Sequence, residues 1–150
     1  MIDYADKPSE MLKNPLAKAM IEKITCGNRD ASLFLWRFWC FMHAFDDLVD
    51  KDNPITPDEA IRELILFLNE ISFNPFYTTY KASLFSFIAM VANRALTGDQ
   101  WRLNGSEHQK AVSAAVRCGD LDLYAHIAFL CGGWDHMRNI DSDIRVLDKE

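Results

Sequence analysis

A long aromatic run in this chain is followed directly by four side chains that can bind a metal ion. The run extends from Leu33 to Met42, and the four side chains are those of His43, Asp46, Asp47 and Asp50. Spacings of three, four and seven residues place them on one side of an α-helix. Mg²⁺ and Mn²⁺ prefer carboxylate oxygens, and a histidine can bind beside them or orient a carboxylate. The pattern therefore predicts a candidate metal site in the last turn of a helix.

The same helix end has a second interpretation, in which the carboxylates are simply solvated. The opposite side of the helix is apolar, so the core is expected there and the acids are expected to face water. Trp36 and Trp39 complicate this, because they lie on the acidic side, and such a face usually packs on something or lines a cleft. Three carboxylates also oppose the helix dipole, at about 0.3–1 kcal/mol each, which a cation would offset. The sequence leaves both interpretations open.

Other predicted helices carry polar residues that would complete a site if they faced this acidic end. Asn93 lies on an otherwise apolar helix, where a buried amide needs hydrogen-bond partners. Asp135 and Asn139 share one side of the last helix. The candidate ligand contacts are therefore Asn93, Asp135 and Asn139, and the candidate phosphate contacts are Arg94 and Arg138. The alternatives are a helix-end hydrogen bond for Asn93 and a packing groove ending in an exposed turn for the last helix.

The segment Asp46-Asp47-Leu48-Val49-Asp50 resembles the DDxxD motif of all-α isoprenoid synthases, which also follows an aromatic helix. In the terpene synthase branch, a second motif places Asn, Ser or Thr, and Glu at four-residue steps on another helix. Asn93 and Thr97 fit its first two positions, and Trp101 stands where the glutamate belongs. The chain is also much shorter than those enzymes. The resemblance implies that Asp46 and Asp50 bind magnesium, which bridges to a substrate diphosphate.

Length and composition narrow the classes of protein to consider. The chain has 150 residues, which fits one domain, and its net charge of −6 argues against a nucleic-acid partner. The four cysteines show no metal-binding spacing, and the beginning of the chain does not have the pattern of a signal peptide. The longest nearly apolar stretch, 84–92, is too short to span a bilayer. These features predict a cytoplasmic protein without a membrane partner.

Helix signals along the chain predict an all-α, single-domain bundle of about six helices. Capping boxes begin at Thr56 and Ser106, and Asn74-Pro75 is a further helix start. The fourth helix is apolar on most sides and is expected to be central and mostly buried. The tail 141–150 is highly charged and is expected to be frayed. The predicted helices span approximately 9–25, 31–49, 57–72, 75–97, 107–118 and 121–139.

Two hypotheses for function follow from these observations. The first is a divalent-metal site, holding Mg²⁺ or Mn²⁺, for a small molecule that carries a phosphate or diphosphate. The second is a non-enzymatic interaction protein, either a homo-oligomer or an adaptor, in which the acidic helix end is solvated. It rests on an excess of aromatic residues, which protein interfaces favour. The tryptophans that motivate it are Trp36, Trp39, Trp101 and Trp134.

Overall fold

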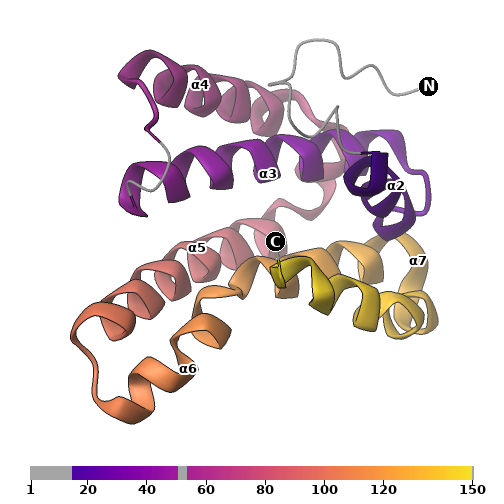
Figure 1. Ribbon diagram of the computed structural model, residues 1–150. Coiled ribbons are helices and arrows are strands. Elements are labelled where there is room, and N and C mark those ends of the chain that lie inside the picture. The colour runs from indigo at the N-terminus through magenta and orange to yellow at the C-terminus, as the bar shows by residue number, and fades with distance from the viewer. Residues whose placement is uncertain (1–14, 51–53, 150) are drawn as a thin grey trace. The chain divides into compact units, whose positions relative to one another are not determined.

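The structure is a computed structural model that describes residues 15–50 and 54–149 (Figure 1). These ranges contain helices and no strand, so the predicted all-α class is confirmed. None of the helices in them has the length and apolar composition needed to span a lipid bilayer. The elements are α2 (Pro15–Ile24), α3 (Arg29–Asp50), α4 (Pro57–Phe73), α5 (Pro75–Asn104), α6 (Glu107–Arg117), α7 (Gly119–Arg145) and the short 3-10 helix η1 (Val146–Lys149).

The helix starts follow the capping signals in the sequence. At the start of α4, the Thr56 hydroxyl accepts the Glu59 N–H and the Glu59 carboxylate accepts the Thr56 N–H, and Ser106 and Gln109 repeat this arrangement at α6. These capping boxes satisfy backbone donors that a helix leaves without partners. The start of α3 is capped by Asn28, whose side-chain oxygen accepts the Ala31 N–H at 2.9 Å. Residues 9–14 of the first predicted helix lie outside the described residues.

Two helices are longer than their sequence signals predict. Helix α5 continues past residue 97 to Asn104, through Gly98. A side chain at Gly98 would lie only 2.9 Å from the Ser113 carbonyl oxygen and would clash with Arg117, so glycine serves close packing here and does not end the helix. Helix α7 continues to Arg145, in contrast to the frayed tail expected at 141–150. Buried Ile140 and Ile144 anchor this last segment.

The chain divides into two compact units, Met1–Thr79 and Tyr80–Glu150, which are described separately. In the first unit, α3 and α4 lie side by side (Figure 1). The aromatic run of α3 forms its core: Phe34 contacts Tyr77 with ring centroids 5.4 Å apart, and Phe38 contacts Phe67 at 6.2 Å. Phe41 also stacks on Phe67, with ring centroids 4.8 Å apart. This aromatic packing fixes which side of α4 faces α3.

The second unit is held together by a network of ion pairs. Asp122 on α7 binds the guanidinium groups of Arg94 on α5 and Arg145 near the end of α7. Burial acts to raise the pKa of Asp122, but the hydrogen bonds from Arg145 and Arg94 outweigh it and hold the pKa below its ordinary value. Arg94 also donates to the carbonyls of Ala115 and Val116, at the end of α6. Arg94 of α5 therefore links this helix to both α6 and α7.

Backbone geometry at Gly133 interrupts α7. The residue has φ 80° and ψ −175°, a conformation that essentially only glycine adopts, and the helix is kinked there. A second irregular residue, Tyr80, interrupts α5 at the boundary between the units.

Helix α5 differs from the predicted central, mostly buried helix. Leu84 and Val91 are buried, but large apolar side chains on other sides of the helix are exposed. The apolar side chains on the different sides of α5 therefore do not all pack into a core. The exposed ones are Phe85, Met90, Leu96 and Leu103.

Candidate functional site

The predicted metal site lies at the end of α3, in the first unit. His43 and Asp46 are exposed, and Asp47 is half-buried. The Trp39 indole N–H donates to Nε2 of His43, and the two rings stack with centroids 5.8 Å apart. Trp39 and His43 therefore share one side of the helix, as their four-residue spacing predicts. The last turn of α3 itself contains no basic residue.

The aspartate motif is described only in part, because it ends at Asp50. It is the last residue of α3, but its side chain lies outside what the structure describes. Among the described side chains, no group of three His, Cys, Asp or Glu residues is arranged to hold a metal ion. The full set of Asp46, Asp47 and Asp50 therefore stays a sequence prediction.

The other predicted site residues all lie in the second unit. Asn93 on α5 is exposed, so the expectation that it is a buried amide is not met. Arg94 uses its guanidinium for the helix-joining contacts described above. Asp135 and Asn139 are exposed on α7, and Arg138 lies 3.8 Å from the Asp141 carboxylate. The structure thus groups Asp135, Arg138 and Asn139 on one short helical segment, beyond the Gly133 kink.

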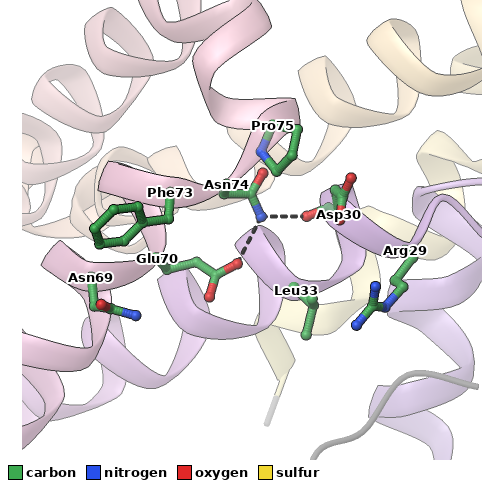
Figure 2. A pocket seen from close by; sticks show the side chains of 8 residues that line it. All are labelled: Arg29, Asp30, Leu33, Asn69, Glu70, Phe73, Asn74 and Pro75. Atoms are coloured by element: carbon green, nitrogen blue, oxygen red, sulfur yellow. Dashed lines mark hydrogen bonds between the residues drawn. The ribbon is translucent and has the colours of Figure 1, made fainter.

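A pocket of 160 Å³ lies where the start of α3, the end of α4 and the start of α5 meet (Figure 2). Asn74 is its central residue and is buried. Its amide donates to the Asp30 carbonyl oxygen at 2.8 Å and to Glu70 Oε1 at 2.7 Å, while its oxygen accepts the Tyr77 N–H at 3.0 Å. All the polar atoms of this side chain serve the helix junction, which identifies Asn74 as a structural residue.

Helix α4 has an unusual distribution of buried and exposed residues. Glu63 and Phe67 face the interior, with Glu63 only 7% exposed. Four large aliphatic side chains on another side of the same helix are 41–60% exposed. We call these four the α4 face: Ile61, Leu64, Ile65 and Leu68. Sequence periodicity detects this apolar stripe but does not show that it points away from α3.

Glu63 faces a second buried charge, Arg37 on α3, which is 8% exposed. Burial raises the pKa of the Glu63 carboxyl, and the positive charge of Arg37 partly offsets this effect. Within the part of the chain that the structure describes, no hydrogen bond satisfies Arg37 Nη1 or Glu63 Oε2. The pair is therefore coupled through space without being fully hydrogen-bonded. The pair does not follow from helical spacing, although an arginine inside an apolar run is a signal that a buried partner is needed.

His126 of the second unit has a structural environment. Its Nε2 lies 3.1 Å from the Ser83 hydroxyl, and its ring stacks on Phe87 with centroids 4.4 Å apart. The Ser83 hydroxyl also lies 3.1 Å from the Tyr80 carbonyl oxygen, to which it donates. Burial lowers the pKa of His126, which favours the neutral ring. These contacts join α5 to α7 next to the irregular residue Tyr80.

Comparison with known proteins adds no further assignment: no family model, no curated protein and no solved structure matches this chain.

Proposed function

We propose that this protein is a helical interaction protein, and that the α4 face is its docking surface for an apolar helix of a partner. The observation that carries the proposal is the orientation of α4, which buries Glu63 and leaves Ile61, Leu64, Ile65 and Leu68 exposed. Folding normally places aliphatic side chains inside and carboxylates outside. For a helix with the reverse arrangement, burying the exposed aliphatic side chains against a partner would be favourable.

The chemistry of the α4 face specifies the kind of partner. The side of the helix between Ile61 and Leu68 carries only aliphatic side chains, in a chain whose net charge is −6. A charged partner surface would lose hydration there without gaining an ion pair. An apolar helix stripe, spaced at three and four residues, would interdigitate with this face and bury both surfaces.

We expect Ile65→Lys to change the free energy of unfolding by no more than about 0.5 kcal/mol, because a surface substitution removes no core contact. Phe67→Ala is the contrasting variant on the same helix. It should cost about 3–5 kcal/mol, since Phe67 is buried against Phe38 and Phe41. Urea unfolding followed by circular dichroism, at low protein concentration, measures both.

The same variants test whether the α4 face binds apolar molecules. Fluorescence of the dye 1-anilinonaphthalene-8-sulfonate should rise with the wild-type protein and fall with Ile65→Lys. Phe73→Lys is the matched control, because Phe73 is 78% exposed on the same helix but lies away from the α4 face. A loss of stability in Ile65→Lys as large as that of Phe67→Ala would mean that the face belongs to a core, and the proposal would fail.

The second candidate function is binding of Mg²⁺ or Mn²⁺ by Asp46, Asp47 and Asp50, with His43 beside them, for a phosphate-bearing small molecule. The observation that favours it is the last turn of α3, which places acidic side chains at the negative end of the helix dipole. Both the helix dipole and the mutual repulsion of the acids attract a cation to this end.

For this second function we expect Mg²⁺ or Mn²⁺ to raise the melting temperature of the wild-type protein, because a ligand that binds only the folded state stabilises it. The Asp46→Asn/Asp50→Asn variant should lose that rise. Asp58→Asn is a suitable control, since Asp58 is an exposed acid in the first turn of α4. An unchanged melting temperature with both metals, or an equal rise in the double variant, would contradict metal binding at this motif.

A further inference from the structure

We infer that the pocket at the junction of α3, α4 and α5 binds a small amino carboxylate, a molecule whose ammonium group and carboxylate are joined by a short apolar chain. The inference concerns the pocket of Figure 2 and does not rest on the α4 face. It follows from the charges that line the pocket, from the two helix ends that meet there and from its size.

Groups of opposite charge line the two ends of this pocket. Figure 2 shows Leu33 between the Glu70 carboxylate and the Arg29 guanidinium. Glu70 Oε1 accepts the Asn74 amide at 2.7 Å, and neither Glu70 Oε2 nor the Arg29 guanidinium has a partner among the described residues. One carboxylate oxygen and one guanidinium are therefore available to a ligand, with an apolar side chain between them.

The Glu70 end of the pocket suits an ammonium group. Glu70 and Phe73 lie in the last turn of α4, which is the negative end of the helix dipole and contains no basic residue. Phe73 also lines the pocket and is 78% exposed, and the face of an aromatic ring attracts an ammonium ion. An ammonium group has three N–H donors, for which this end offers the carboxylate, the ring and the Asn69 amide oxygen.

The Arg29 end of the pocket suits a carboxylate. Arg29 is the first residue of α3 and therefore lies at the positive end of that helix dipole. Its guanidinium can hold a carboxylate through two parallel hydrogen bonds. Asp30 lines the pocket as well, so acids outnumber bases in the lining. The ammonium group of the ligand should therefore contribute more to binding than its carboxylate.

The size of the pocket limits the ligand to a small molecule. Its volume of 160 Å³ is that of about five water molecules at ~30 Å³ each. Pockets for drug-sized ligands are larger, at roughly 300–1,000 Å³. We therefore choose 4-aminobutanoate as the probe, because a short methylene chain joins its two charges. A ligand this small should bind with a dissociation constant of about 1 mM.

Titration of the full chain with 4-aminobutanoate at constant ionic strength, followed by ¹H–¹⁵N NMR, tests the inference. The side-chain amide of Asn74 reports on the pocket, because it donates to the Glu70 carboxylate and the Asp30 carbonyl oxygen. Its signals should shift and saturate. Butylamine, which lacks the carboxylate, should bind roughly threefold more weakly, and butanoate should give no saturating shift. Shifts that do not saturate well above about 1 mM, or equal binding of butylamine, would overturn the inference.

Two variants assign the two ends of the pocket. Glu70→Gln keeps an oxygen for the Asn74 amide but removes the charge, so it should weaken the binding of both 4-aminobutanoate and butylamine. Arg29→Gln should bind 4-aminobutanoate no more tightly than butylamine. Because Arg29 is exposed, this variant keeps the test valid even if Glu70→Gln disturbs the helix junction.

Arg62→Gln is the matched control, because Arg62 is an exposed arginine of α4 that does not line the pocket. It should bind all three probes like the wild type. If Arg29→Gln still preferred 4-aminobutanoate over butylamine, or if Arg62→Gln lost this preference equally, the assigned site would be wrong.

Discussion

Arg37→Leu should lower the free energy of unfolding by about 1–3 kcal/mol, because the buried Glu63 carboxylate loses the attraction of a nearby positive charge. The substitution removes the positive charge on α3 that lowers the pKa of Glu63, and the carboxylate stays buried. Urea unfolding of the full chain near neutral pH measures the loss. Arg62→Leu is the matched control, because Arg62 also acts on Glu63 but is exposed, and it should cost less than about 1 kcal/mol.

The double variant Arg37→Leu/Glu63→Leu should recover the loss and be neutral or more stable than the wild type by about 1–4 kcal/mol. Arg37 Nη1 and Glu63 Oε2, which have no hydrogen bond to any described residue, are both absent in this variant. A double variant that is no more stable than Arg37→Leu alone would show that the two charges do not act as a pair.

The raised pKa of Glu63 also gives the sign of its pH dependence. In the folded protein this pKa lies above its ordinary value of 4.5, so the folded state holds the proton more tightly than the unfolded state. The stabilisation from the protonated carboxyl is complete below 4.5 and is lost as the pH rises through the folded pKa. In Glu63→Gln, this part of the pH dependence of unfolding should be absent.

Asn74→Ala should cost about 2–4 kcal/mol, because one substitution breaks contacts at three helix ends. The cap on the Tyr77 N–H accounts for about 0.5–2 kcal/mol. The remainder comes from the lost donation to the Asp30 carbonyl and the Glu70 carboxylate, which are left without this partner. Urea unfolding measures the change. Asn69→Ala, at an exposed residue lining the same pocket, should stay within about 0.5 kcal/mol of the wild type.

Asn74→Asp separates the two roles of this side chain. It keeps an oxygen for the Tyr77 N–H, but it loses both donations and places a second carboxylate beside Glu70. We therefore expect it to be destabilised near neutral pH and to be partly restored by Glu70→Gln, which removes the repulsion. Equal stability of Asn74→Asp and the wild type would show that the capping oxygen alone holds the junction.

Much of the secondary structure follows from local signals in the sequence. The capping boxes at Thr56 and Ser106 and the cap at Asn74 are where the sequence places them, because each is completed within a few residues of chain. The ends of α5 and α7 were predicted too early. Gly98 and the charged segment after Asn139 resemble helix ends locally, but contacts with Arg117, Asp122 and Arg145 keep these segments helical.

In the candidate site too, some features follow from local sequence signals and others depend on tertiary contacts. The shared side of Trp39 and His43 follows from helical spacing and is present in the structure. The exposure of Asn93 and the use of Arg94 as a structural residue do not follow from spacing, because both depend on what neighbouring helices supply. The metal-binding role of Asp46 and Asp50 stays a prediction, tested by the melting experiments above.

The sequence by itself determined the all-α class, most helix starts and the existence of an apolar stripe on α4. These properties arise from hydrogen bonds and side-chain spacing within a few turns of helix. Only the tertiary structure decided that Phe67 fills the contact with α3, that Glu63 is buried beside it and that Ile61, Leu64, Ile65 and Leu68 point away. The physical reason is that helical periodicity tells which residues share a side, whereas the burial of that side depends on the packing of another helix against it.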